Sequence, residues 1–216
     1  MKEEIFKGET YKEFQTVEEG NDWGWKFFSD ILIPSKDNNA YLSVLYYTGS
    51  MFRKWNKVLR KYPAIESGLF EECAKKGGAE DGEQICRIKE VNSLLRQHNI
   101  PENIIVYRYT KKKHIKDLCS SHFFRNGLRF FDKAFLSTTL ISELLYDFAK
   151  TKEYDCLLKI YVPKGTQGAY VSLKNPLSKL DEQEVLLAPN LMLEIVKVHH
   201  RLKKTILIEC RVVNDE

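Results

Sequence analysis

Long apolar runs are missing from this chain of 216 residues. No stretch reaches the length of about 18 apolar residues that a transmembrane helix requires, so the sequence excludes such a helix. The first five residues, MKEEI, are polar and charged, and they do not resemble a cleaved secretory leader. We therefore expect a protein that stays in the cytoplasm, leaves the cell by a route without a cleaved leader, or has a leader that this sequence lacks.

Cysteine is sparse and shows no metal-ligand spacing. The five cysteines form no CxxC pair and no Cys/His pattern, so we expect no zinc or other metal site. A bridge between Cys73 and Cys86 around a glycine-rich loop stays possible. Five free thiols in a reducing compartment is the simpler interpretation.

An excess of one charge sign is also missing. The 34 Lys and Arg residues against 30 Asp and Glu leave a net charge of +4, which is too small to indicate nucleic-acid binding. The basic runs 111–114 and 199–204 are interpreted as exposed turns, with attraction of an acidic partner as the lesser alternative.

The hydrophobic content of 43% is enough for one domain with a substantial core. Residues 1–102 are predicted to be mainly helical, most clearly at 42–59, where Gly49 predicts a turn between two helices. From residue 103 the pattern changes to short β-strands rich in β-branched and aromatic residues, with one or two helical turns at 144–150. The strands are expected at 104–109, 134–139, 156–162, 168–171, 184–187, 191–199 and 205–213. Helices followed by strands predict an α+β fold, with residues 1–216 as a single domain.

Two glutamates bracket one glutamine directly before a short apolar strand, in Glu182-Gln183-Glu184. Because side chains alternate along a strand, Glu182 and Glu184 are expected to lie on the same face. Two carboxylates on one face repel each other and are costly to desolvate, so they either work together or both lie in water. Taken alone, the pair favours the exposed strand end.

Two further motifs precede this pair. Arg108 is the one charge in the apolar-aromatic strand 104–109, and the run 137–139 (Ser-Thr-Thr) follows Phe135-Leu136. The order aromatic-Arg, Ser-Thr-Thr, Glu-x-Glu resembles the arginine-type mono-ADP-ribosyltransferases, the family of the clostridial binary actin-modifying toxins. The run 47–50 (Tyr-Thr-Gly-Ser) with Asn56 is similar to the family's N-terminal helix. The resemblance extends over about residues 41 to 213. Each motif alone could consist of ordinary strand residues, but the occurrence of all three in this order favours the resemblance.

The resemblance implies the fold and the chemistry. It implies a mixed, mainly antiparallel two-sheet β core that binds NAD as substrate and transfers its ADP-ribose to a protein arginine. Glu184 would bind the ribose and stabilise its developing positive charge, and Glu182 would orient the incoming guanidinium. Ser137 would hold Glu184 in place, and Arg108 would grip the phosphates. The Glu at 182 is what the family associates with arginine as acceptor.

Further NAD contacts are implied for Tyr47, Thr138 and Thr139. The stretch 139–156 corresponds to the nicotinamide-binding loop, where Phe148 is the expected stacking residue and Tyr146 its alternative, with Lys150 or Lys152 supplying positive charge. The stretch 171–181 corresponds to the loop that reads the acceptor protein, with Leu173, Leu177 and Leu180 as its apolar contacts. Three positions depart from the family pattern: Thr139 replaces a serine, Tyr109 a second arginine and Ala134 an asparagine.

The resemblance also suggests a monomeric bacterial toxin or effector, secreted or injected into a host cell, with actin or a small GTPase as acceptor. Two alternatives stay open from the sequence. One is an NAD glycohydrolase, in which water replaces the acceptor. The other is a non-catalytic module that binds a nucleotide or a protein, which the changes at Tyr109 and Ala134 motivate.

Overall fold

The computed structural model describes residues 1–33, 39–77, 79–172, 182–199 and 205–213. The chain begins with a β-hairpin, β1 (Lys2–Phe6) and β2 (Glu9–Glu13), which was not among the predicted strands. Lys7 and Gly8 both have positive φ, 52° and 83°, as the tight turn of a two-residue hairpin requires. The strands are rich in Lys and Glu, so they lack the apolar alternation by which a strand is recognised.

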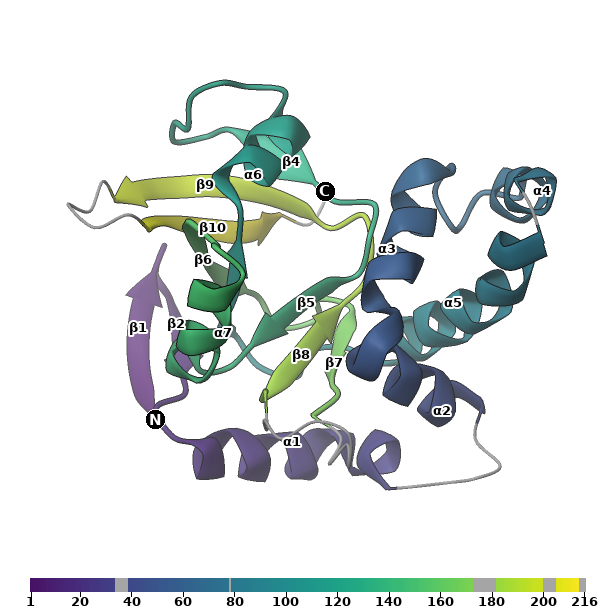
Figure 1. Ribbon diagram of the computed structural model, residues 1–216. Helices are drawn as coiled ribbons and strands as arrows, with labels where there is room; N and C mark the ends of the chain where they lie inside the picture. Colours follow the sequence, from purple (N-terminus) through teal and green to yellow (C-terminus); the bar gives the residue numbers. More distant parts are fainter. Residues whose placement is uncertain (34–38, 78, 173–181, 200–204, 214–216) are drawn as a thin grey trace.

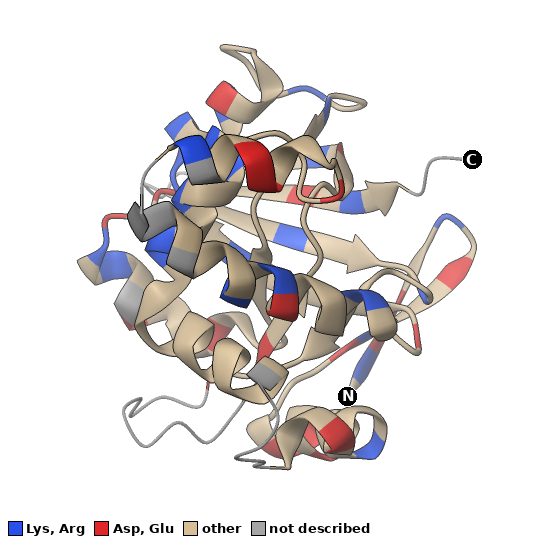
Figure 2. Ribbon diagram, turned by 90° about the vertical axis from the view of Figure 1, so that its right-hand side faces the viewer, with Lys and Arg blue, Asp and Glu red and all other residues tan. Residues whose placement is uncertain are grey.

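The helical portion follows the hairpin and lies along the bottom and right of Figure 1. It consists of α1 (Val17–Leu32), α2 (Asn39–Tyr46), the π-helix η1 (Tyr47–Met51), α3 (Phe52–Lys61), α4 (Leu69–Lys76) and α5 (Ala79–Gln97). Thr16 begins α1 as its N-cap by accepting a hydrogen bond from the backbone of Glu19. Lys and Arg are interspersed with Asp and Glu over this side (Figure 2).

The predicted turn at Gly49 is wrong. Gly49 lies inside η1, and the helical path continues from α2 through η1 into α3. The amide of Phe52 donates to the carbonyl of Tyr47, five residues back, which is the wider spacing of a π-turn. Glycine tolerates a helix interior at a cost of about 1 kcal/mol, so its presence alone does not end a helix.

The strand-rich portion forms one continuous path in the order β4-β9-β10-β6-β3-β5-β8-β7. The members are β3 (Ile104–Thr110), β4 (Arg129–Phe131), β5 (Leu136–Thr139), β6 (Cys156–Val162), β7 (Gly168–Tyr170), β8 (Glu184–Leu187), β9 (Met192–His199) and β10 (Ile206–Val213). Strands β3 and β5 are joined by a single pair, Tyr107 with Thr139. This narrow seam divides the path into two half-sheets, and all pairings except β10–β6 and β2–β3 are antiparallel. The expected α+β fold is confirmed.

Three short helices lie within the strand-rich portion: α6 (Lys112–Cys119), η2 (Ser142–Leu145) and α7 (Tyr146–Thr151). The run 111–114 was interpreted as an exposed turn, but residues 112–114 begin α6. Ile115, buried on the inner face of α6, anchors this helix. Asp155 accepts a hydrogen bond of 2.7 Å from the backbone of Lys112 and so satisfies one of the first amides of α6.

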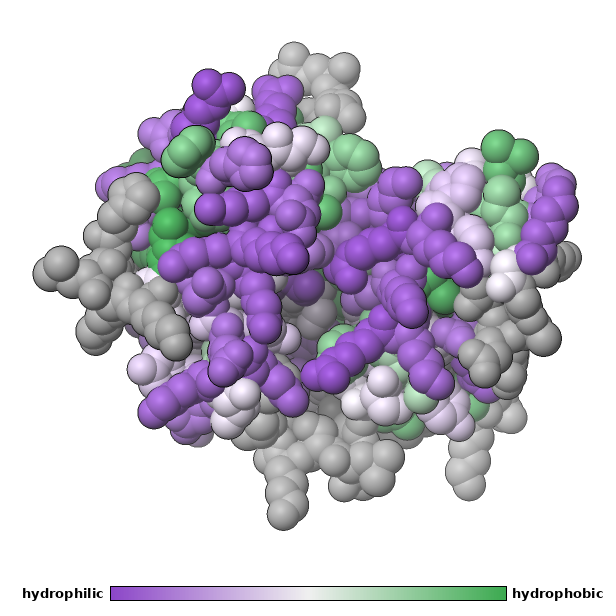
Figure 3. Space-filling model, turned by 45° about the horizontal axis from the view of Figure 1, so that its top comes forward, coloured by the Kyte–Doolittle hydropathy of each residue, from purple (hydrophilic) through white to green (hydrophobic). Residues whose placement is uncertain are grey.

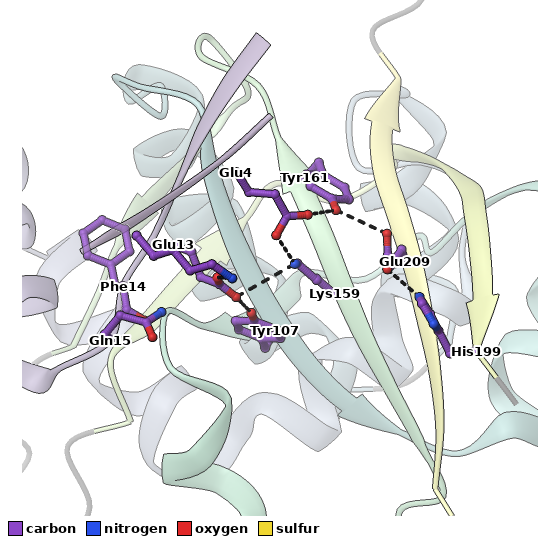
Figure 4. A network of polar contacts seen from close by, with 10 residues as sticks. Glu4, Glu13, Phe14, Gln15, Tyr107, Lys159, Tyr161, His199 and Glu209 are labelled. Atoms are coloured by element: carbon purple, nitrogen blue, oxygen red, sulfur yellow. Dashed lines mark hydrogen bonds and ion pairs between the residues drawn. The ribbon is translucent and has the colours of Figure 1, made fainter. Parts of the chain in front are cut away.

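A polar network fastens the N-terminal hairpin to the sheet (Figure 4). Lys159 of β6 donates 2.6 Å to Glu4 of β1, and its Nζ lies 3.9 Å from Glu13 of β2. Glu13 accepts a hydrogen bond from the Tyr107 hydroxyl, and Glu4 accepts one from Tyr161. One half-buried ammonium thus serves two carboxylates from two different strands, and the hairpin is fastened to β3 and β6.

Helices and strands share one hydrophobic core. Its buried members include Trp55 of α3, Ile88 and Leu95 of α5, and Ile104 and Ile160 of the sheet. All five cysteines are free, so Cys73 and Cys86 form no bridge. No helix within the described ranges is long and apolar enough to cross a membrane.

Candidate active site

A cavity of about 280 Å³ opens between the helical portion and the sheet, next to the seam. Helices η1 and α3 form one wall, and β3, β5 and the start of β8 form the other. The turn after α7 contributes at one side. Its lining includes Tyr47, Thr48, Arg53, Asn56, Tyr107, Arg108, Tyr109, Ser137, Thr138, Leu145, Lys152, Tyr154, Glu182 and Glu184.

Arg108, Ser137 and Glu184 are linked by two hydrogen bonds, of which the first crosses the seam. The Arg108 guanidinium donates 2.6 Å to the carbonyl oxygen of Ser137. The Ser137 hydroxyl donates 2.6 Å to a carboxylate oxygen of Glu184. Glu184 pairs with Thr139 in the β5–β8 ladder, so Ser137 is its diagonal neighbour on the same face. Three residues that are distant in the sequence therefore meet at one wall of the cavity.

Glu184 is a buried carboxyl group, with 6% of its surface exposed. Burial raises its pKa to about 7, and the nearby Glu182 carboxylate acts in the same direction. The hydrogen bond from Ser137 and the charge of Arg108 oppose this rise. The group therefore changes its charge near neutral pH, and Ser137 stabilises the charged form.

Glu182 also lines the cavity, but not for the reason that strand alternation predicts. It lies before β8, and Gln183 between the two glutamates has a φ of +48°, in the left-handed region. The backbone turns at Gln183, and both carboxylates still line the same cavity. The Thr139 hydroxyl donates 2.7 Å to the Glu182 carbonyl and fixes this turn. Burial raises the pKa of Glu182 as well.

Gln183 is held by α1, which explains how an uncommon backbone conformation persists. Its side-chain amide donates 3.0 Å to Asn21, and a Cβ placed on Gly20 would lie 2.1 Å from the Gln183 side-chain oxygen. The backbone carbonyl of Gln183 accepts a bond of 3.0 Å from Leu140. Helix α1 thus positions the link between the two carboxylates.

The helical wall presents Tyr47 and Asn56, which bond to each other. The Asn56 amide donates 3.0 Å to the Tyr47 hydroxyl, and burial raises the pKa of that hydroxyl well above its usual range. The Tyr47 ring packs edge-on against Phe135 at 5.3 Å between centroids. Both side chains are buried polar groups with a satisfied partner, so this wall is rigid.

The charges in the cavity have two signs. Arg53, Arg108 and Lys152 supply cations, and Glu182 and Glu184 supply carboxyl groups. Such a site suits a ligand that carries anionic groups and a centre on which positive charge develops. In the described part of the chain, no group of three His, Cys, Asp or Glu side chains is placed to hold a metal ion.

The sequence model of the ADP-ribosyltransferase exoenzymes matches residues 20–214, nearly the whole chain. The chain belongs to this family. The expected resemblance is thereby confirmed, and residues from all three of the motifs on which it was based line the cavity.

Relatives agree with this assignment. An NAD(+)–arginine ADP-ribosyltransferase of Enterococcus faecalis is 26% identical over 166 residues, which cover 74% of this chain but only 29% of the relative. The chain therefore spans less than a third of that curated relative. The structure of C3stau2 from S. aureus with NAD is similar in fold, with a TM-score of 0.72, 18% identity, and coverage of 95% of this chain and 99% of the other.

A second solved structure is the ADP-ribosylating toxin BECa of a binary enterotoxin of C. perfringens, with NADH. It has a TM-score of 0.69 and 23% identity, over 98% of this chain and 54% of that chain. These likenesses show that the fold is that of ADP-ribosyltransferase toxins.

The structure brings most of the proposed site residues together. Seven of them line the cavity: Arg108, Ser137, Thr138, Glu182, Glu184, Tyr47 and Lys152. Thr139 is buried behind it and supports Glu182, and Ala134 is buried next to Asp132. Tyr146 and Lys150 line a neighbouring cavity instead. Phe148 belongs to α7, but its side chain lies outside the described residues, as do residues 173–181 with Leu173, Leu177 and Leu180.

Arg53 was not predicted as a site residue, and Asn56 was predicted only as part of the family's N-terminal helix. Gly49, Arg53 and Asn56 are spaced by four and three residues, so a continuous helix would place them on one face. The spacing was not recognised because the predicted turn at Gly49 separated them. The π-turn, a feature frequent at functional sites, could not be recognised from composition.

Proposed function

We propose that this ADP-ribosyltransferase transfers ADP-ribose from NAD to an arginine side chain of a protein. The observation that carries the proposal is the hydrogen-bonded Ser137–Glu184 pair with Glu182 in the same cavity. The arginine specificity of the Enterococcus faecalis relative supports the choice of acceptor.

NAD would bind with its two phosphates toward the cations of the cavity. Arg108 would fork onto a phosphate, and Arg53 and Lys152 would add positive charge in the same cavity. The Arg108 guanidinium is already oriented by its bond to the Ser137 carbonyl, which lowers the cost of ordering it when the ligand binds. Tyr47, Thr138 and the loop with Phe148 complete the proposed contacts.

Bond breaking releases nicotinamide, which takes the electron pair of the bond between its ring nitrogen and the ribose. Positive charge then develops on the ribose, as in glycoside hydrolysis. Glu184, in its ionised form, stabilises this charge more than it stabilises the neutral sugar, which is the condition for catalysis. Ser137 positions Glu184 and favours its ionised form.

The acceptor guanidinium would enter beside Glu182. A nitrogen of the acceptor arginine forms the new bond to the ribose carbon, and Glu182 takes the proton that this nitrogen loses. The raised pKa of Glu182 makes it a better base than an exposed glutamate. The two carboxyl groups thus divide the work, one at the sugar and one at the acceptor.

The acceptor protein and the biological setting are proposals of the same kind. The family suggests a toxin or effector that is secreted or delivered to a host cell, acts there as a monomer and contributes to virulence. Actin and small GTPases are the first acceptors to test.

Incubation of a host-cell lysate with the protein and labelled NAD tests the function. We expect label on protein arginine, its loss in Glu184→Gln, and transfer but not NAD hydrolysis to be abolished in Glu182→Gln. If labelled nicotinamide is released and no protein ever carries label, the enzyme is a glycohydrolase. If neither product forms and NAD does not bind, the proposal fails and the non-catalytic alternative takes its place.

A further inference from the structure

Residues 111–133 carry an excess of positive charge. The segment, here called the basic segment, contains α6, the loop after it and β4. It carries seven Lys and Arg against two Asp, an excess of five, whereas the whole chain has an excess of only four. The charges of all other residues sum to nearly zero, although α3 is also basic, with five Lys and Arg and no Asp or Glu.

Much of this charge is uncompensated. Lys112 and Arg129 have carboxylate partners, at 4.0 Å from Asp155 and 3.2 Å from Glu194. Four exposed cations have no carboxylate within ion-pair distance among the described residues: Lys111, Lys113, Arg125 and Lys133. Uncompensated cations on one segment repel each other, so an anionic surface would stabilise them.

The basic segment also exposes aromatic rings. Phe123, at the loop after α6, is 81% exposed, and Phe131 of the edge strand β4 is 43% exposed. The exposure of Phe123 is fixed by the loop: Ser121 donates 2.9 Å to the Phe123 carbonyl, and Phe124 packs inward against the core. Hydrophilic side chains cover most of the top face of the molecule, with a few hydrophobic ones among them (Figure 3).

We propose that the basic segment binds the anionic headgroup surface of a lipid membrane, with Phe123 inserted at the headgroup level. Cations gather over anionic lipid, and an aromatic ring at a loop tip gains by leaving water. An acidic protein would also satisfy the cations and cover Phe123, so the choice of a membrane rests on where the basic segment lies.

The position of the basic segment favours a membrane, rather than the acceptor protein, as its ligand. In Figure 1, α6 and β4 lie at the top of the molecule, whereas β8 begins at its lower end, next to Glu182. An acceptor must reach Glu182, and a membrane bound at α6 leaves that end free. This inference does not depend on the proposed acceptor or reaction.

Co-sedimentation with vesicles tests the proposal. The full chain should bind phosphatidylcholine vesicles that contain about 30% phosphatidylserine and should not bind pure phosphatidylcholine. The double variant Lys111→Gln/Arg125→Gln should lose roughly 25-fold in vesicle affinity, about fivefold for each cation. Phe123→Ser should lose about tenfold in vesicle affinity, and the size of this loss should depend less on salt than the loss in the double variant.

The matched control is Lys26→Gln/Lys164→Gln, which removes the same charge from two exposed sites outside the basic segment. It should bind vesicles within about twofold of the wild type. The proposal is overturned if anionic vesicles are not bound, or if the control loses as much as the basic-segment variant. It is also overturned if that variant binds vesicles normally but modifies an acidic acceptor protein more slowly. NAD turnover without acceptor, measured in all variants, reports the catalytic function separately.

Discussion

Glu184 is a carboxyl group held where burial favours its neutral form, although the proposed chemistry needs its charge. The Ser137 hydroxyl and the Arg108 guanidinium oppose the effect of burial. The balance places the pKa of Glu184 at about 7 in the ligand-free protein. Small changes in its neighbours therefore change the fraction of active enzyme at neutral pH.

Ser137→Ala tests this balance through the pH profile. Loss of the hydrogen bond raises the pKa of Glu184, so the midpoint of kcat/KM against pH should move upward by about one unit. At neutral pH the transfer rate should fall roughly fivefold, with less loss near pH 9. Ser137→Thr keeps a hydroxyl and should restore the profile. An equal loss at every pH would mean that Ser137 has only a structural role.

Glu184→Gln should make the protein more stable at neutral and alkaline pH. The pKa of Glu184 rises from its ordinary value of 4.5 to about 7 in the folded protein. The contribution of Glu184 to the stability is therefore fully present below about pH 4.5 and is lost as the pH rises through about 7. The neutral glutamine avoids this loss, for a gain of about 3 kcal/mol at most at about pH 8. Denaturant unfolding of both proteins at about pH 5 and pH 8 measures it. A gain of equal size at both pH values would contradict the explanation.

At the scale of elements, α1 shapes the active site without lining the cavity. Gly20 and Gly24 face the sheet, and a Cβ on Gly24 would lie 2.2 Å from the Tyr170 ring. The Gln183 side chain packs against Gly20 in the same way. The packing of α1 therefore determines the backbone turn between Glu182 and Glu184. The helix is thus part of the site through contact with a neighbour of the reactive groups.

Gly20→Ala is expected to damage activity as well as stability. The added methyl group displaces the Gln183 side chain, which should cost about 1–3 kcal/mol of unfolding free energy. The transfer rate should fall at least tenfold, because the two carboxyl groups move relative to each other. Gly68→Ala, where no atom lies within 4 Å of the new Cβ, should leave both quantities nearly unchanged. Normal transfer by a destabilised Gly20→Ala protein would contradict the role of α1.

Buried strands were the elements that the sequence predicted best. Strands β6 and β8 have the expected bounds because each is an apolar run with few alternative conformations. The β1–β2 hairpin was not predicted, since the main hydrogen-bond partners of its Glu4 and Glu13 are Lys159, Tyr107 and Tyr161, far along the chain. A long-range polar network leaves no local pattern to recognise.

The site was predictable as a set of residue types, not as a geometry. Arg108, Ser137, Glu182 and Glu184 were identified from the order of their motifs, and they do line one cavity. The π-turn before α3 and the positive φ of Gln183 depend on tertiary packing, so no sequence pattern predicts them. Strand alternation correctly predicted that Glu182 and Glu184 lie on the same side. The reason was wrong, because a backbone turn at Gln183 and not a regular strand brings them together.

At the scale of the whole molecule, the helical and strand-rich portions share one core. Ile88 and Leu95 of α5 belong to the same buried cluster as Ile104 and Ile160 of the sheet. Neither portion can bury its apolar face without the other. We therefore expect the division at residue 102 to be a change of secondary structure and not a domain boundary.

The full chain should unfold in one cooperative transition. Heating followed by calorimetry and by far-ultraviolet circular dichroism should give the same midpoint, and residues 1–102 alone should not form a stable fold. NAD at about 100 times its dissociation constant should add roughly 2.7 kcal/mol to the stability of the full chain. Two separate transitions, of which only one responds to NAD, would show two independent domains.

The single pair that joins β3 to β5 has a mechanical meaning. Tyr107 and Thr139 are the one ladder contact between two half-sheets, and Arg108 and Glu184 stand on opposite sides of it. A dinucleotide that touches both residues spans this narrow joint, so we expect its binding to restrict the angle at which the halves meet. Amide exchange at this joint would then slow when NAD is bound, while the distant strands β9 and β10 keep their rates.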